Sequence, residues 1–64
     1  MNNLKRLRTE AGMSQSELAK KAEVNARLIQ HYEQGFRDIN KTQALTLYKL
    51  ALALDTQMEK LLQL

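Results

Sequence analysis

The chain has 64 residues, of which 44% are hydrophobic and 27% are charged, so it has room for one domain with a small core. It contains no cysteine and one histidine, which excludes disulfides and cysteine-ligated metal and argues against a histidine-based metal site. The formal net charge is +3, and residues 1–32 hold the whole surplus, with six Lys or Arg against three Asp or Glu. This imbalance suits a polyanionic partner, although an ordinary solvated face would look the same.

Several classes of protein are disfavoured at this stage. No apolar run approaches the roughly 20 residues that cross a bilayer, and the N-terminus lacks the apolar stretch of a signal peptide, so we expect a cytoplasmic protein without membrane contact. So short a chain leaves little room for a deep substrate cleft. It has no glycine-rich phosphate loop, and Ser14 and Ser16 have no histidine in the same segment. We therefore expect no enzyme, no cofactor and no small-molecule ligand.

Apolar residues recur at helical spacing almost throughout the chain, and no segment alternates with the period of a strand. A first helix is predicted to end near Gly12, and its apolar side is formed by Leu4, Leu7 and Ala11. Ser14 and Glu17 stand three residues apart, as a capping box requires, and predict the start of a second helix. The apolar side of that helix consists of Leu18, Ala19 and Ala22.

A third helix is predicted after a short break, with Asn25 as its N-cap and Gly35 at its C-terminus. Its inward-facing residues are expected to be Leu28, Ile29 and Tyr32. The opposite side must then face solvent, and it carries Ala26, Arg27, Gln30, His31 and Gln34. This side has no carboxylate, and its arginine, amide and imidazole groups suit DNA base edges and phosphates. A metal role for His31 is not indicated, because no second ligand lies four residues away on either side.

Residues 36–41 are predicted to form a loop, and residues 42–54 a helix that is apolar nearly all round, as at the centre of a core. Thr56 and Glu59 stand three apart, so a further capping box is predicted to open a short last helix. The apolar residues of that helix are Met58, Leu61, Leu62 and Leu64. These elements predict an all-α fold, a compact domain of five helices over residues 1–64.

The segment 14–34 joins two short helices by a turn of about three residues, which is the spacing of a helix-turn-helix formed by the second and third helices. It holds the run Ser-Gln-x-Glu-Leu-Ala at 14–19, followed by Tyr-Glu-x-Gly at 32–35. With these runs in register, residues 4–35, and more loosely 44–62, resemble the lambda-repressor-like, Cro-type helix-turn-helix domains of the XRE family.

The resemblance implies a third helix that enters the DNA major groove. The base-reading positions of the family correspond here to Ala26, Arg27 and His31, with Gln30 between them in either role. Residues that contact phosphate or brace the third helix correspond to Gln15 and Asn25. The loop that grips the DNA backbone corresponds to the segment with Arg37, Asn40 and Lys41. The resemblance also implies an ion pair between Arg8 and Glu33.

The chain departs from the family pattern in three places, one of which is the loop after Gly35, which is a few residues longer than in the shortest members and has Ile39 near a common proline. Glu23 stands where the family has glycine in the turn, so either the backbone there is left-handed, with roughly 1 kcal/mol of strain, or the turn is looser. Ala26 stands where many members carry Gln or Ser, and its methyl group offers only an apolar contact, as to a thymine methyl. The aromatic residues Tyr32, Phe36 and Tyr48 are expected to pack, and they are too few for binding single strands by base stacking.

The function expected from these features is sequence-specific binding of double-stranded DNA by a transcriptional regulator, most simply a repressor. One small domain makes a limited interface, so a homodimer on a palindromic or pseudo-palindromic operator is expected. Its dimer surface is predicted on the last helix, with Leu61, Leu62 and Leu64, with the alternative that Leu61 and Leu62 belong to the core. The alternative is a protein-interaction module, such as an antitoxin-type domain that binds a partner, which an apolar or acidic outer face on residues 26–34 would favour.

Overall fold

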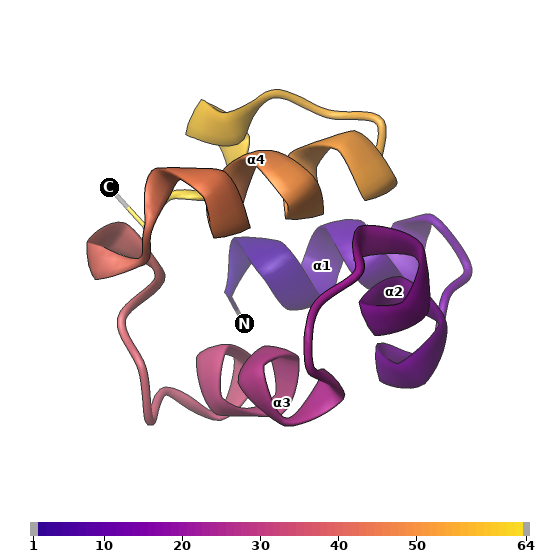
Figure 1. Cartoon of the computed structure of the whole chain (residues 1–64), viewed down its shortest axis with the longest axis horizontal. Helices are drawn as coiled ribbons and strands as arrows, with labels where there is room; N and C mark the ends of the chain where they lie inside the picture. Colours follow the sequence, from indigo (N-terminus) through magenta and orange to yellow (C-terminus); the bar gives the residue numbers. More distant parts are fainter. Residues whose placement is uncertain (1, 64) are drawn as a thin grey trace.

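A computed structural model of the chain describes residues 2–63, and within that range it contains short helices and no strand. Figure 1 shows how they are arranged, with α1 crossing the middle of the view, α3 on one side of it and α4 on the other. The α-helices are α1 (Asn3–Glu10), α2 (Gln15–Ala22), α3 (Ala26–Gln34) and α4 (Ala44–Ala53). Two single turns of 3-10 helix follow α3 and α4, η1 (Ile39–Lys41) and η2 (Met58–Leu61). The all-α expectation is therefore confirmed for the described residues.

The predicted starts of α2 and α3 are confirmed. The Ser14 hydroxyl accepts from the Glu17 N–H at 3.0 Å, and the Glu17 carboxylate accepts from the Ser14 N–H at 2.8 Å, which is a complete capping box. Hydrogen bonding of the Glu17 carboxylate with the Ser14 backbone, and secondly with the Ser14 side chain, lowers the pKa of Glu17. The Asn25 side chain caps α3 by accepting from the Arg27 N–H at 2.8 Å. Ala11, placed on the apolar side of the first helix, lies exposed because α1 ends one residue earlier.

The predicted fifth helix is wrong, since only one 3-10 turn forms at Met58–Leu61. The capping box expected of Thr56 and Glu59 is also absent, because the N-cap of η2 is Gln57, without a side-chain hydrogen bond. The Thr56 N–H instead donates to the Ala51 carbonyl at 2.9 Å and so completes the C-terminus of α4. Thr56 therefore ends one helix and cannot begin the next.

The core is built from side chains of every helix of the described residues, η1 included through Ile39. The largest fully buried side chains are Leu4, Leu18, Ile29, Leu50 and Leu61. They belong in turn to α1, α2, α3, α4 and η2. Around them, α2 packs against α3 and α4, and α1 packs against α3 and η2. Burial at one shared core fixes the orientation of α3, and with it the side of α3 that meets solvent.

The dimer surface predicted on the last helix is wrong for the residues that are described. Leu61 is fully buried in the core. Leu62 is partly buried, and its carbonyl accepts from the Asn3 side chain at 2.6 Å. Leu64 lies outside the described residues. The C-terminal turn therefore closes the core rather than presenting an apolar surface.

Candidate nucleic-acid interface

The turn between α2 and α3 is tight although it lacks glycine. Glu23 takes the left-handed conformation, with φ 58° and ψ 43°. The next N–H, that of Val24, donates to the Ala19 carbonyl at 3.0 Å and closes the C-terminus of α2. Of the two alternatives for this turn, the strained left-handed residue is the one observed, and the looser turn is not.

α3 buries two of the three residues predicted to face inward, while the third, Leu28, is only partly buried. Ile29 is fully buried and Tyr32 nearly so. The exposed residues of α3 are Arg27, Gln30 and Gln34. Ala26 and His31 are half-buried, and the Ala26 methyl group packs partly against the core. The face available to a ligand thus offers a guanidinium, two amides and part of an imidazole.

The one carboxylate in α3, that of Glu33, points inward and is neutralised. Arg8 of α1 donates to it twice, from Nε at 2.7 Å and from Nη2 at 3.0 Å, and Gln15 of α2 donates from Nε2 at 3.0 Å. The Glu33 and Arg8 side chains are only 3% and 13% exposed. The ion pair implied by the resemblance is therefore present, and it ties α3 to both other N-terminal helices.

The charge states of this pair follow from the same contacts. Burial by itself raises the pKa of Glu33, but the hydrogen bonds from Arg8 and Gln15, together with the Arg8 charge, outweigh it and lower that pKa. The hydrogen bond to Glu33 raises the pKa of Arg8 against the opposing effect of burial. Glu33 is thus held ionised beside a cation, and the exposed face of α3 keeps its lack of negative charge.

Phe36 was expected to pack but is 74% exposed, directly after the C-terminus of α3. Its ring meets that of His31 edge to face, with centroids 5.9 Å apart and planes at 67°. An aromatic contact of this kind restricts the imidazole to part of its rotamer range. The packing expected of Phe36 is thus limited to this contact with His31, and most of its ring stays in solvent.

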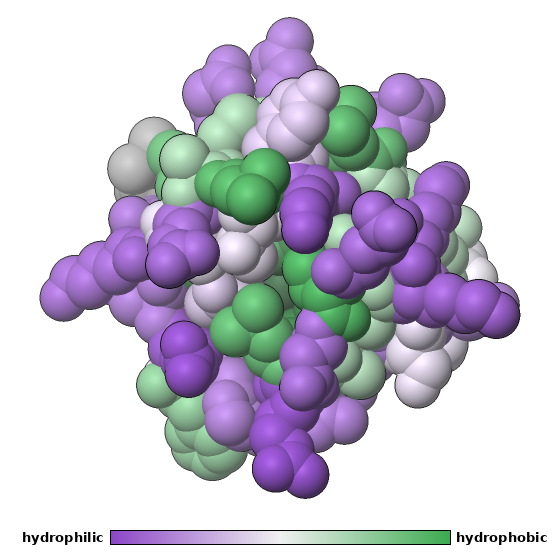
Figure 2. All heavy atoms as spheres, in the orientation of Figure 1, coloured by the Kyte–Doolittle hydropathy of each residue, from purple (hydrophilic) through white to green (hydrophobic). Residues whose placement is uncertain are grey.

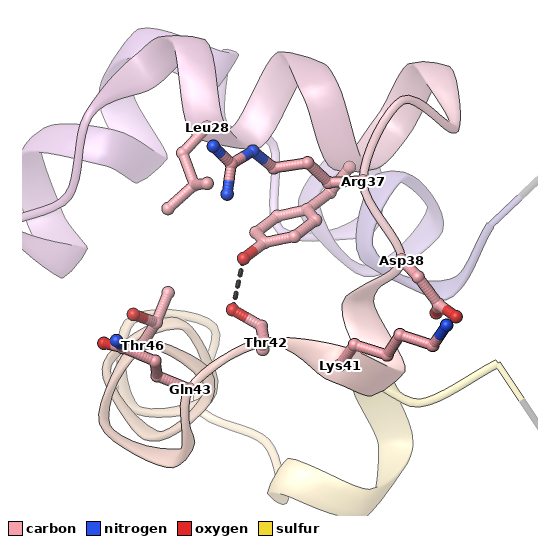
Figure 3. Close-up of a pocket in the computed structure, with 8 residues that line it drawn as sticks. Leu28, Arg37, Asp38, Lys41, Thr42, Gln43 and Thr46 are labelled. Carbon is pink, nitrogen blue, oxygen red and sulfur yellow. Dashed lines mark hydrogen bonds between the residues drawn. The ribbon is translucent and has the colours of Figure 1, made fainter.

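The loop after α3 borders a hollow of about 450 Å³ between α3 and the start of α4, shown in Figure 3. Its walls carry the exposed cations Arg37 and Lys41, and the Tyr32 hydroxyl hydrogen-bonds to Thr42 across it. The rest of the lining comes from Leu28, Asp38, Gln43 and Thr46. The sequence pattern predicted the two cations. It did not predict the polar residues at the start of α4, because the one feature that marks them in the sequence is their position before an apolar helix.

The Asn40 side chain does not line that hollow, and its hydrogen bonds go to a different part of the chain. Its side chain donates to the Gln63 carbonyl at 3.0 Å and accepts from the Gln63 N–H at 2.8 Å. Both ends of the amide are thus engaged by one backbone unit 23 residues away. This contact ties η1 to the chain that follows η2.

Other kinds of site have no support in the part of the chain that is described. Residues 2–63 contain no helix both long and apolar enough to cross a membrane. Over the same residues, the side chains of His, Asp and Glu do not gather in any group that could hold a metal ion.

Comparison with known families agrees with the geometry. A family model described as helix-turn-helix, that of the lambda-repressor and Cro-like XRE family, matches residues 4–61. A search of curated proteins found none that matches the chain. The matched range covers all the helices from α1 to η2, except that it begins one residue after the start of α1. Proteins of this family are DNA-binding regulators of transcription, and this chain belongs to the lambda-repressor and Cro-like helix-turn-helix family.

Proposed function

We propose that the chain binds double-stranded DNA in a sequence-specific manner, with α3 in the major groove, and that it acts as a transcriptional repressor. The observation that carries this proposal is the exposed face of α3. It presents Arg27, Gln30 and Gln34, while the only carboxylate of the helix is turned inward and paired. Arginine recognises guanine through two hydrogen bonds, and glutamine recognises adenine in the same way.

Base reading is assigned to Arg27, Gln30 and His31, with Ala26 restricted to an apolar contact through its half-exposed methyl group. Phe36 supports the orientation of His31 through the edge-to-face contact. Because α3 is nine residues long, these side chains all lie within two and a half turns of one helix. A segment of that length fits in the major groove, which is about 12 Å wide.

Phosphate contacts are assigned on either side of α3. The Gln15 amide uses one N–H for Glu33 and has a second for phosphate, so it can brace α3 and grip DNA together. Asn25 is exposed at the N-terminus of α3, where backbone N–H groups attract anions. Arg37 and Lys41 extend the cationic surface beyond the other end. Asn40 uses its amide oxygen and one N–H for Gln63, and its second N–H can donate to phosphate in the same way as that of Gln15.

A repressor of this kind would act by occluding a promoter as a homodimer on a palindromic or pseudo-palindromic operator. The test is selection of bound sites from random duplex DNA, followed by measurement of the stoichiometry on the selected site. We expect a two-fold symmetric consensus that binds two chains. Retention of all duplexes with equal affinity at low salt would contradict sequence-specific reading, and failure to retain any duplex would contradict DNA binding altogether.

A further inference from the structure

α4 is apolar on two sides, although only one of them is buried. Leu47, Leu50 and Ala51 face the core. On the other side three large side chains stay in solvent, namely Leu45 at 62%, Tyr48 at 49% and Leu52 at 60% exposure. The spacing of three and then four residues places them on one face of the helix, and we call this row the α4 stripe. Figure 2 shows hydrophobic side chains interrupting the hydrophilic surface over α4.

Lysines border the α4 stripe without ion-pair partners. Lys49 follows Tyr48 directly and lies one turn after Leu45. Lys21, from the last turn of α2, lines with Lys49 and Leu52 a hollow of about 190 Å³ beside the stripe. Among residues 2–63 the ion pairs are Arg6–Glu10 and Arg8–Glu33, so neither lysine is paired there. Glu23 also lines this hollow, and two cations against one anion leave its rim positive.

We infer that the α4 stripe is the docking site for an amphipathic helix of a partner protein, with apolar residues over the stripe and carboxylates facing Lys49 and Lys21. A docking helix presents its apolar anchors at i, i+3 or i+4, and i+7. The α4 stripe offers its own apolar side chains at the same spacing, so the two rows can run alongside each other. The positive rim selects for acidic flanks, because opposite charges across an interface guide the choice of partner.

A second copy of this chain fits the α4 stripe less well than an acidic helix. A two-fold axis at Tyr48 would bring Lys49 close to Lys49 of the other copy, and such a contact between like charges is unfavourable.

The test uses two synthetic helical peptides with the same leucines at i, i+3 and i+7, one flanked by glutamates and one by lysines. Each is titrated into the isotopically labelled chain without DNA, so that failure of DNA binding has no bearing on the result. We expect amide shifts on α4 but not on the exposed face of α3, saturation below about 1 mM, and about tenfold tighter binding of the acidic peptide.

Charge reversal makes this test sharper. Lys49→Glu is expected to weaken the acidic peptide about tenfold and to strengthen the lysine-flanked one, whereas Arg6→Glu on α1, which makes the same charge change, leaves both nearly unchanged. Leu52→Asn is expected to weaken both peptides. Leu52 is 60% exposed, so the folded state should survive this change, as thermal unfolding can verify.

Three results would overturn the inference. One is equal or tighter binding of the lysine-flanked peptide to the unmodified chain, and another is no saturable binding of the acidic one. The third is dimerisation of the chain, seen by sedimentation equilibrium and abolished by Leu52→Asn, which would make a second copy the occupant of the α4 stripe.

Discussion

Four residues with positive φ end the four α-helices of this domain. They are Gly12, Glu23, Gly35 and Asp55, with φ of 73°, 58°, 83° and 54°. In each case the N–H of the following residue donates to a carbonyl five residues earlier, as from Val24 to Ala19 and from Thr56 to Ala51. Glycine adopts this conformation without a steric penalty, whereas an L-residue pays about 1 kcal/mol for it. Among residues 2–63, the non-glycine residues in this strained conformation are Glu23 and Asp55.

Replacing Glu23 by glycine should stabilise the domain. Glu23→Gly removes the clash of a left-handed Cβ, and we expect the free energy of unfolding to rise by about 1 kcal/mol in urea denaturation. The matched control is Lys20→Gly at an exposed position inside α2, which should lower it by about 1 kcal/mol. A lower stability for Glu23→Gly would mean that the Glu23 side chain makes a stabilising contact that outweighs the strain.

Arg27 should contribute to the preference for the operator sequence rather than to affinity for DNA in general. Arg27→Ala is expected to weaken operator binding by about 1–3 kcal/mol and to relax selection at one base position. The control is Arg6→Ala, which removes the same charge from α1, where Arg6 forms an exposed pair with Glu10 at 3.4 Å. The measurement is affinity for the operator and for single-base variants of it. Uniform weakening on every sequence would instead identify Arg27 as a phosphate contact.

At the level of the elements, the network around Glu33 sets how the helix-turn-helix sits on the rest of the domain. Arg8 also donates from Nη1 to the Met13 carbonyl at 2.7 Å, so one guanidinium joins α1 to the segment before α2 and to α3. Gln15 adds a contact from the first residue of α2. Two charged side chains that are only 13% and 3% exposed, and are joined by two hydrogen bonds, depend on each other, because removal of either leaves the other without its counter-charge.

This network should make the domain sensitive to acid. Because the pKa of Glu33 is lowered in the folded state, its stabilisation is complete above the unfolded pKa of about 4.3 and is lost as the pH falls through the folded value. Glu33→Gln is expected to reduce stability by about 2 kcal/mol at pH 7 and to flatten the decline between about pH 5 and pH 2.

Glu10→Gln is the matched control, since Glu10 is exposed and its pair with Arg6 is weak at 3.4 Å. It should keep the stability at pH 7 within about 0.5 kcal/mol and retain the steep decline in acid. Urea denaturation at several pH values measures both variants. An unchanged acid decline in Glu33→Gln would show that other carboxylates cause it.

The loop between α3 and α4 should contribute to affinity without sequence preference. Lys41→Ala is expected to weaken binding to all duplexes and to reduce the slope of log affinity against log salt by about one. Lys60→Ala in η2 makes the same charge change and should leave the slope nearly unchanged. If the slope for Lys41→Ala also stays unchanged, the loop does not contact DNA.

At the level of the whole molecule, size limits how two copies can share an operator. The domain extends 24 × 22 × 21 Å, while half-sites read on one face of the duplex lie about 34 Å apart. Two copies so placed can meet only at their edges. We therefore expect cooperative binding to depend on spacing, with about five added base pairs reducing affinity at least tenfold and about ten restoring part of it. Equal affinity at all spacings would mean that the chains bind independently.

Local interactions made much of this fold predictable. The capping box of Ser14 and Glu17, the Asn25 cap and the end of α3 at Gly35 all depend on groups within five residues of one another. The inward side of α3 followed from spacing alone. The last capping box failed because two local patterns competed for Thr56, and closure of α4 prevailed.

What the chain's own sequence determined is where α2 and α3 begin, where α3 ends, and which residues of α3 meet solvent. Only the tertiary structure decided that Leu61 closes the core, that Asn40 is held by Gln63, and that Leu45 and Leu52 remain exposed. An apolar pattern nearly all round α4 is compatible with burial of any side. Caps and turns are settled by neighbours along the chain, whereas burial is settled by residues distant in sequence that meet only when the chain folds.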